Sequence, residues 1–401
     1  MTAPGKATVV VPTGFLAILI LVSALNPLVI NMFVPSMPGI MTSLGTDFST
    51  VQFVLSYYLF ATAIAQLVLG PLSDRFGRRP VLIAGLLIFV VASIICTFAP
   101  TIGVLLFGRI LQGVGGCAGI VIGRAIIRDR YDREQAASTL AYVTMGYATA
   151  PMIGPVVGGI IDDHFGWRAN FGLVLALGIL TTVVAARFLP ETRVHPAGGR
   201  AASSFFGDLL QLARIPSFWA FTLAGSFAST AFFIFLGAAP FVSSRLLGLS
   251  GTAFGLYFLF VSLGYIIGSF LTGRYGSRYG VVAMIVIGAI LQLASAAVLV
   301  AVAAAEWLTP LAIFAPVYVG GFANGLVLPN AVAGAVSVRP QLAGAAAGLN
   351  GSVQIAMGAA ATVVVGKLID IYPSALPMAL GMLVFAVASL IAGIWTRSAR
   401  G

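Results

Sequence analysis

The stretch Gly70-Pro-Leu-Ser-Asp-Arg-Phe-Gly-Arg-Arg79 lies between two long apolar runs. Four of its last six residues are charged, and charged side chains are costly to place in hydrocarbon. Irregular backbone is also unstable where it faces lipid, because its polar groups have no partners there. The sequence therefore predicts that this stretch is a short loop, exposed to water, between two membrane helices.

A degraded copy of the loop supports an internal duplication. The segment Gly273-Arg-Tyr-Gly-Ser-Arg278 matches Asp74–Arg79 at an offset of 199 residues, about half of the 401-residue chain. A second pair of segments, Val156–Asp162 and Val364–Asp370, is also similar. The pattern predicts a transporter built from two repeats rather than a membrane enzyme or a receptor.

The composition excludes a soluble protein. Charged residues make up 8% of the chain and the mean hydropathy is +1.07, whereas soluble domains carry about 25% charged residues. A membrane-spanning helix needs about 20 apolar residues. Twelve stretches qualify, at 12–37, 50–71, 80–99, 102–127, 136–161, 168–189, 217–241, 252–273, 281–304, 308–334, 345–369 and 374–396. The predicted fold class is an all-α integral membrane protein with two pseudo-symmetric six-helix bundles.

The central link divides the chain. Residues 190–216 are rich in Pro, Gly, Ser and charge, whereas the other links are short. We therefore expect an N-terminal bundle over 1–189, a cytoplasmic central loop over 190–216 and a C-terminal bundle over 217–401. Within the loop, Phe205–Arg214 has apolar residues at helical spacing, which predicts an interfacial helix.

The net charge of +10 does not indicate a nucleic-acid partner, because the basic residues are scattered over many loops rather than gathered on one face. Lys and Arg are retained on the cytoplasmic side of membrane proteins. With the amino terminus inside, most of the 21 basic residues fall on that side. Both termini are therefore predicted to be cytoplasmic, with the lipid bilayer as the main partner.

The charged loop has the chemistry of a gate. Asp74 ends a helix facing several arginines, and its carboxylate can pair with one of them or with the positive end of a nearby helix. Such a bond can close one side of the membrane in one state and break in the other. A basic topology anchor would not need the spacing of Gly70 and Gly77. The predicted gate residues here are Gly70, Asp74, Arg75, Gly77 and Arg78.

The fourth apolar stretch carries Arg109 and Gln112. An arginine within the membrane is expected to face a cavity and to be functional. Counting about 1.5 Å per residue, Arg109 lies roughly 10 Å below the outer surface, and Asn31 on the first helix lies at a similar depth. We expect the three residues to form a coupling site at the cavity, with Arg109 and Asn31 as neighbours across it.

The fifth stretch carries a motif of small residues and prolines. Residues at a four-residue spacing form a flat face for another helix, and proline removes backbone hydrogen bonds and permits bending. The motif comprises Gly146, Ala150, Pro151, Gly154, Pro155, Gly158 and Gly159. It predicts a close, bendable helix contact.

The loop Gly70–Arg79 resembles the signature between helices two and three of the major facilitator superfamily, and the resemblance spans essentially the whole chain. It implies twelve helices in two bundles around a central cavity. The helix-five motif resembles that of the family's exporters, which is associated with antiport. Asn31–Pro38, Gln66, Arg128-Asp129 and Gly166–Arg168 are similar to the bicyclomycin- and phenicol-resistance group of drug:proton antiporters. Arg128 and Asp129 are therefore added to the gate.

The resemblance also implies that helices one, four, seven and ten line the cavity. Polar and aromatic residues are the natural candidates for substrate contact, although a mid-helix Asn can equally join two helices and a Phe more often packs. The candidates are Asn26, Tyr58, Tyr147, Phe232, Phe233, Phe235, Tyr265, Tyr318, Asn324, Asn350 and Gln354.

The chain departs from the resistance group at one position, because that group usually has aspartate where Asn31 stands. All eleven carboxylates fall in predicted loops or at helix ends, and arginine does not release its proton. Three interpretations stay open. Position 31 carries an introduced Asp→Asn change that traps one conformation, coupling uses a carboxylate at a helix end, or transport is uncoupled.

The sequence thus predicts an exporter of small organic molecules or antibiotics in the bacterial inner membrane, resembling drug:proton antiporters and functional as a monomer. We expect no enzyme activity, cofactor or metal. One alternative is an exporter or facilitator of anionic metabolites, suggested by a lone buried cation. The other is a membrane sensor or scaffold that transports nothing.

Overall fold

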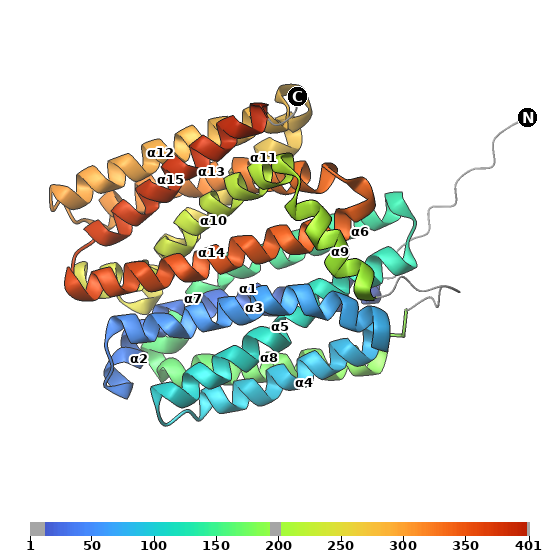
Figure 1. The fold of residues 1–401 in the computed structure, drawn as a ribbon. Coiled ribbons are helices and arrows are strands. Elements are labelled where there is room, and N and C mark those ends of the chain that lie inside the picture. Colours follow the sequence, from blue (N-terminus) through green and yellow to red (C-terminus); the bar gives the residue numbers. More distant parts are fainter. Residues whose placement is uncertain (1–12, 193–201, 399–401) are drawn as a thin grey trace, which may run out of the picture.

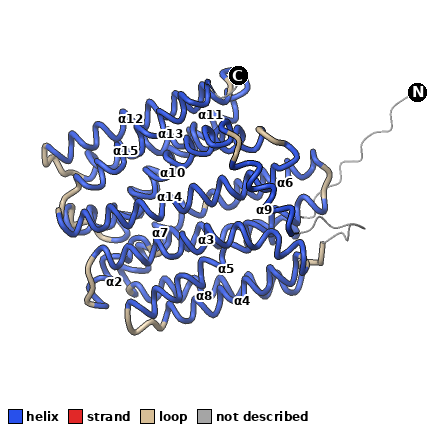
Figure 2. The backbone as a smooth tube through the Cα atoms, in the orientation of Figure 1, coloured by secondary structure: helices blue, strands red, loops and turns tan. Residues whose placement is uncertain are grey.

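A computed structural model describes residues 13–192 and 202–398 (Figure 1). Within these ranges the chain is helical, with short connections (Figure 2). Twelve spans are long and apolar enough to cross a membrane, which confirms the predicted fold class. The elements are α1 Thr13–Met32, η1 Val34–Ser36, α2 Met37–Leu44, α3 Phe48–Phe76, α4 Arg78–Thr97, α5 Ile102–Arg130, α6 Arg133–Ala148, α7 Ala150–Phe165, α8 Trp167–Phe188, α9 Ala202–Ala213, α10 Pro216–Phe241, η2 Val242–Leu246, α11 Gly251–Tyr279, α12 Val281–Ala304, α13 Pro310–Ser337, η3 Pro340–Leu342, α14 Ala343–Ile371 and α15 Leu376–Ser398.

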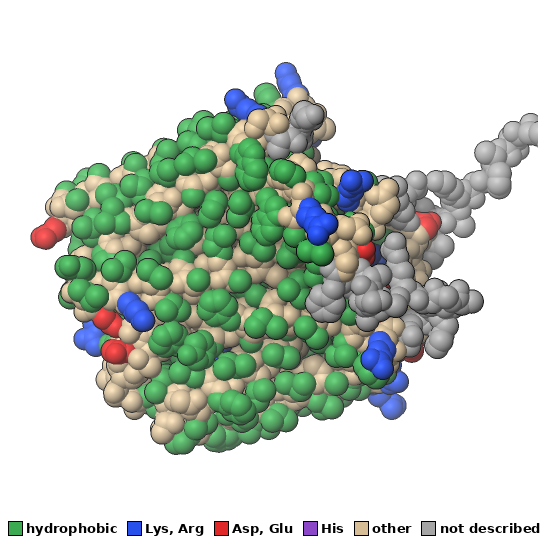
Figure 3. Space-filling model, in the orientation of Figure 1, with side chains coloured by type: hydrophobic (Ala, Val, Ile, Leu, Met, Phe, Trp, Pro, Cys, Tyr) green, Lys and Arg blue, Asp and Glu red, His purple; other side chains and the backbone are tan. Residues whose placement is uncertain are grey.

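The helices form two groups that lie side by side. In Figure 1 most of α1–α8 lies in the lower half, with α6 at the right beside α9, and α10–α15 lie above them. Between the groups α14 runs along α3 and α7 packs against α11. On the face shown in Figure 3, hydrophobic side chains cover the middle of the molecule and charged ones lie toward its two ends. This distribution suits a bilayer, because an apolar surface faces lipid without cost while charges need water.

Two predicted helices are interrupted. The first span continues to Leu44, but it changes from α1 to the 3₁₀ turn η1 and then to α2. Pro35 and Pro38 lie at this change, and proline cannot donate the backbone hydrogen bond that a continuous helix requires. The fifth span divides into α6 and α7 at Thr149, just before Pro151. The interruption therefore lies two residues before the first proline of the motif.

The link between the halves contains α9, which covers most of the predicted interfacial helix. Leu212 on α9 is fully buried, in a cluster with Phe218 of α10 and Ala346 of α14. The indole nitrogen of Trp219 donates to the carbonyl of Ala213, 2.8 Å away. These contacts fix the end of α9 against the C-terminal half.

The two halves repeat one another in detail. Both α3 and α11 are 29 residues long, and each begins after a side-chain cap, Asp47 on the amide of Thr50 and Ser250 on that of Ala253. Each helix ends at a glycine with positive φ, Gly77 at 102° and Gly280 at 82°. The caps, helix bounds and glycines all lie 203 positions apart.

This offset corrects the predicted repeat register of 199 residues. The counterpart of Asp74–Gly77 is Ser277–Gly280, one helical turn beyond the segment that the sequence match selects. A Gly-Arg-Tyr-Gly pattern earlier in α11 resembles the loop better, but α11 continues through it because the chain turns only at Gly280.

Candidate functional site

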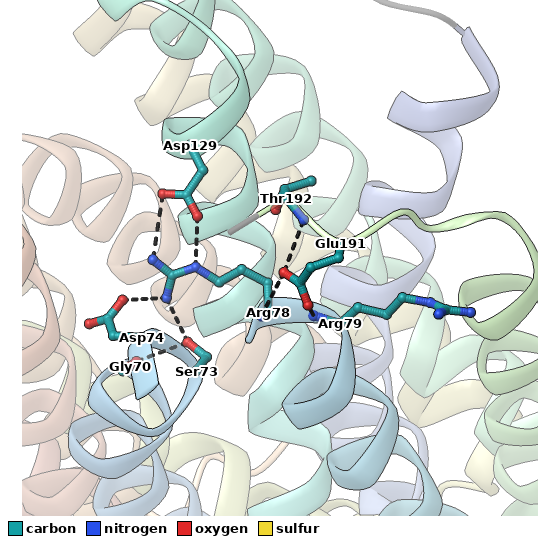
Figure 4. A network of polar contacts seen from close by, with 8 residues as sticks. All are labelled: Gly70, Ser73, Asp74, Arg78, Arg79, Asp129, Glu191 and Thr192. Atoms are coloured by element: carbon teal, nitrogen blue, oxygen red, sulfur yellow. Dashed lines mark hydrogen bonds and ion pairs between the residues drawn. The ribbon is translucent and has the colours of Figure 1, made fainter. Parts of the chain in front are cut away.

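Arg78, the first residue of α4, joins the ends of three helices (Figure 4). Its Nε donates to Asp129 at the end of α5, 2.7 Å away, and a terminal nitrogen lies 2.5 Å from Asp74 on α3. The same nitrogen donates to the hydroxyl of Ser73, which in turn donates to the carbonyl of Gly70. We call this set of residues the Arg78 network.

The two acidic partners are not equivalent. The Asp129 side chain is 22% exposed and that of Asp74 is 62% exposed, whereas Arg78 is only 11% exposed. Ion pairs that water reaches contribute little, because water competes for both charges. Asp129 therefore holds Arg78 more firmly, and Asp74 can exchange its partner at small cost.

Glu191 completes this region, and the sequence analysis missed it. Its two carboxylate oxygens accept the backbone amides of Arg78 and Arg79 at 3.0 and 3.1 Å. These are the first two amides of α4, which have no partner within the helix. The contact links the central segment to the N-terminal half. The only signal in the sequence was that Glu191 is an acidic residue shortly after the end of α8.

Gly77 makes this arrangement possible. Its φ of 102° and ψ of 151° lie in a region that residues with a side chain rarely adopt. A Cβ at this position would also lie 2.7 Å from a carboxylate oxygen of Glu191. The glycine is therefore required both by the turn and by the acid packed on it.

Arg109 lies within the N-terminal half and is fully buried. Its guanidinium lies over the rings of Phe33 and Tyr58, with the central carbon 4.3 and 4.2 Å from the ring centroids. Nε donates to the carbonyl of Val54, and a terminal nitrogen donates to Gln112 at 2.6 Å. Aromatic faces attract a cation and stabilise it when it is desolvated.

This position differs from the expectation that Arg109 faces the cavity opposite Asn31. Asn31 donates to the carbonyl of Pro27 on its own helix, and its Cβ faces Gly154 on α7. Arg109 contacts Phe33 instead of Asn31, and Phe33 lies two residues further along the chain. Depth in the membrane indicated the level of both residues but not the direction in which each side chain points.

The helix-five motif forms two contact faces. On one, a Cβ at Gly158 would collide with the backbone of Met32 of α1, and a Cβ at Gly154 would pack tightly against Asn31. On the other, Gly159 lies against the backbone of Gly251, and the carbonyl of Pro155 lies against Gly255 of α11. The predicted close contact is present on both faces. The motif packs α7 within its own half on one side and against the other half on the opposite side.

A cavity of about 340 Å³ lies between the halves, and the fifteen described residues that line it are uncharged. The N-terminal half contributes Pro27, Pro151 and Met152. The C-terminal half contributes every polar group, on α10, α11, α13 and α14. The full lining is Pro27, Pro151, Met152, Ser229, Phe232, Phe233, Val261, Ser262, Tyr265, Ile266, Gly321, Asn324, Leu328, Gln354 and Ile355.

Only some of the predicted cavity residues lie there. Phe232, Phe233, Tyr265, Asn324 and Gln354 line the cavity. The others that the structure describes pack elsewhere, and the side chain of Tyr147 lies outside the described residues. Asn26, Tyr58, Phe235 and Asn350 are buried, and Tyr318 stacks on Phe260.

The helices around the cavity also differ from the expected set. No described residue of α5, the fourth span, lines it, whereas α7, α11 and α14 do. The sequence analysis missed Met152, Ser229 and Ser262, because a small polar or apolar side chain in an apolar helix carries no distinctive pattern.

The halves are joined at the end of the bundle opposite the Arg78 network, on the left in Figure 1. There Gln52 of α3 donates to the carbonyl of Gly237 on α10 at 2.6 Å, and the hydroxyls of Ser56 and Thr362 lie 2.8 Å apart. The rings of Phe48 and Phe241 pack with centroids 5.1 Å apart. The Arg78 network, by contrast, lies within the N-terminal half.

Solved structures of similar shape are transporters. A nucleoside transporter, described as NupG (D323A mutant), superposes with a TM-score of 0.76 at 12% identity, over 96% of this chain and 100% of that one. A bacterial homologue of the lysosomal transporter Spinster, described as inward-facing and occupied, gives 0.71 at 18% identity, over 96% of each chain. At these identities the similarity establishes the fold.

Curated relatives carry drug-resistance names. The chain is 35% identical to a chloramphenicol resistance protein of Pseudomonas aeruginosa, over 77% of this chain and 71% of the relative. It is 29% identical to a bicyclomycin resistance protein homologue of Haemophilus influenzae, over 86% and 87%. Multidrug resistance protein D of Escherichia coli is 27% identical over 95% of both chains.

The profile of the Major Facilitator Superfamily matches residues 19–362. This match covers most of the chain and includes the Arg78 network, the helix-five motif and the cavity. It agrees with the twelve spans and with the transporter fold of the solved structures. The chain is therefore a multi-pass membrane transporter of the bacterial inner membrane, and it belongs to the Major Facilitator Superfamily.

Proposed function

We propose that this transporter exports small, uncharged or weakly polar amphipathic molecules, antibiotics among them, by alternating access. The observation that carries the proposal is the cavity, whose described lining is uncharged and mostly apolar. A lining of this kind binds through apolar contact and a few hydrogen bonds, so it tolerates ligands of varied shape. The drug-resistance names of the relatives support the same substrate class.

In this proposal the two halves divide the work. Asn324 and Gln354 of the C-terminal half supply the polar contacts for the substrate, whereas the N-terminal half supplies the charged residues of the gate. Because Gln354 already lies near the hydroxyl of Ser229, at 3.5 Å, the pair can rearrange to accept or donate. One chain contains the whole cavity, so we propose that the monomer suffices.

The excess of basic residues in the loops near the Arg78 network supports the proposal that this end of the bundle lies in the cytoplasm. In this proposal the hydrogen bonds between the halves close the outer side. Release to the outside requires those contacts to break and the halves to close around Asp74 and Arg128. We propose that residues 1–189 and 217–401 move as the two bundles, joined by 190–216.

The anionic-metabolite alternative loses its support, because the cation that suggested it is enclosed by aromatic rings away from the cavity. We propose proton antiport for the driving force, by analogy with the resistance group. Asn31 itself cannot carry a proton. It is 4% exposed and its Oδ1 has no hydrogen-bond partner, so the site could hold a protonated carboxyl.

Uptake of chloramphenicol into inside-out vesicles under an imposed pH gradient tests both the proposed substrate class and the proposed proton coupling. Asn31→Asp should increase pH-driven uptake several-fold if position 31 is the coupling site, and Asn26→Asp on the same helix serves as its control. No change with Asn31→Asp would remove position 31 from the coupling mechanism. The proposed substrate class would be overturned if no tested uncharged drug were taken up and organic anions were taken up instead. Loss of that anion uptake in Arg109→Ala would then favour the anionic-metabolite alternative.

A further inference from the structure

We infer that Asp163 and Asp370 form a reciprocal latch that holds the two halves together at the end opposite the Arg78 network. Each carboxylate lies near the end of a helix in one half and accepts backbone amides at the start of a helix in the other. Neither residue belongs to the gate, the cavity or the coupling site proposed above. The inference rests on the alternating access proposed there.

Asp163 of α7 reaches the start of α11. One carboxylate oxygen accepts the amide of Gly251 at 2.9 Å, and the other accepts the amide of Thr252 at 2.8 Å. These are the first two residues of α11. The following amide, of Ala253, is capped locally by Ser250. The acid from the N-terminal half thus completes the cap of a helix in the C-terminal half.

Asp370 of α14 makes the converse contact. Its Oδ2 accepts the amide of Ser49 at 3.0 Å, and Ser49 is the second residue of α3. The next amide, of Thr50, is capped locally by Asp47. Here the C-terminal half supplies the acid and the N-terminal half supplies the helix.

The two contacts correspond to one another in the repeat. Ser49 and Thr252 are both the second residue of their helices and lie 203 positions apart, which is the offset between α3 and α11. Asp163 and Asp370 each lie near the end of one of two equivalent helices, α7 and α14, and each acid crosses to the other half. A contact formed by chance would not be expected to recur at the equivalent amide.

The chemistry suits a contact that must open repeatedly. The first amides of a helix have no partner within it, and its N-terminal end attracts a negative charge. When the halves separate, water can replace the carboxylate because both acids are exposed. The bonds therefore bias the equilibrium without locking it. The backbone contact between Gly159 and Gly251 brings Asp163 close enough to reach α11.

The position of the latch sets its effect on transport. A state open at this end needs the amides of α3 and α11 to lose their partners from the other half. Loss of the two carboxylates should then favour that state. Each exposed carboxylate at a helix start has an effect of roughly two- to fivefold on such an equilibrium.

A distance measurement on the full chain in nanodiscs tests the latch without any substrate. Spin labels at Phe98→Cys and Trp307→Cys report the separation of the halves at this end, since both residues are exposed and lie on loops of different halves. The native Cys96 and Cys117 are buried and should remain unlabelled. Double electron–electron resonance then gives the populations of short and long distances.

We expect Asp163→Ala and Asp370→Ala each to raise the ratio of the long to the short distance about threefold, and the double variant about tenfold, because the two contacts act in parallel. Asp163→Asn should have a smaller effect than Asp163→Ala, since an amide oxygen still accepts hydrogen bonds.

Two variants separate a latch from a general loss of stability. Asp47→Ala removes a cap from the same end of α3 but no bond between the halves, and Asp162→Ala removes the acid beside Asp163, which lies near Gly39 of its own half. Both should leave the distance ratio unchanged even where the melting temperature falls. An unchanged ratio in the double Asp163→Ala, Asp370→Ala variant, or an equal shift with Asp47→Ala, would overturn the latch. Neither result bears on which drugs are exported.

Discussion

The turn between α3 and α4 and the turn between α11 and α12 have nearly the same backbone but different chemistry. Gly77 and Gly280 have φ and ψ values within about 20° of each other. Around Gly77 lie Arg78, Asp129 and Glu191, whereas Ser277 stands at the position equivalent to Asp74. The fold thus needs the turn twice, but among the residues that the structure describes the charged network is present at only one of the two copies.

This difference indicates which features serve the fold and which serve transport. A glycine with positive φ at both turns is a requirement of chain reversal, since each helix must end and the next begin within one residue. An acid and an arginine at one turn only are not needed for that reversal. The comparison supports the proposal that the gate lies in the N-terminal half and that its counterpart is a structural turn.

Among variants that test this comparison, we expect Arg78→Ala to have the largest effect on transport. It removes the side chain that joins α3, α4 and α5 and leaves Asp129 without its closest partner. Loss of a hydrogen bond to a charged group costs about 1.5–3 kcal/mol, so transport should fall tenfold or more in a vesicle uptake assay. Arg274→Ala on α11, exposed on the other copy, should retain near-normal uptake. Equal losses in both variants would contradict the assignment of the gate to one half.

A smaller effect is expected from alanine at the two glycines. Both Gly77→Ala and Gly280→Ala force an unfavourable backbone, at a cost of about 1–3 kcal/mol. Gly77→Ala also places a Cβ against Glu191, whereas no atom lies within 4 Å of a Cβ at Gly280. The melting temperature in detergent should therefore fall further for Gly77→Ala. Combining Gly77→Ala with Glu191→Ala should remove the difference, and a larger fall for Gly280→Ala would contradict this account.

The smallest effect is expected from Asp74→Asn. Because Asp74 is 62% exposed, its pair with Arg78 stabilises the present conformation little. We expect the variant to act on the outward-open state, lowering its population about threefold as judged by cysteine accessibility at the cytoplasmic end. Ser277→Asp should not raise that population. The segment matched by sequence suggests Gly273→Asp for this control, but the repeat register makes Ser277 the equivalent position. A comparable shift with Ser277→Asp would contradict the assignment.

The sequence predicted the spans well because burial in lipid depends on the composition of each segment, largely independently of its neighbours. The twelve stretches and the small-residue face of α7 were visible in this way. The predicted loop at Gly70–Arg79 was too long, because α3 continues to Phe76 and α4 begins at Arg78, so that only Gly77 lies between the helices. It predicted the cavity poorly. The level of Asn350 in the membrane was readable, but a rotation of its helix decides whether its side chain faces the cavity or the core, and that rotation depends on packing.

Arg109 shows the same limit. Its burial in the membrane follows from its position in an apolar stretch, and sequence reasoning could add that it must find partners. The partners themselves, the rings of Phe33 and Tyr58 and the carbonyl of Val54, come from other helices. Aromatic residues are common in membrane helices, so nothing in the chain marked these as the ones that enclose the charge.

The sequence by itself determined that this protein is a duplicated, twelve-helix membrane transporter with an acidic and basic motif in one half. Those properties depend on composition and on local motifs, because hydrocarbon excludes charge wherever it occurs. Only the tertiary structure decided the register of the repeat, the enclosure of Arg109, the lining of the cavity and the crossing of Asp163 and Asp370 to the opposite half. Each of these depends on which groups meet across helices distant in the chain, and such meetings are set by packing rather than by composition.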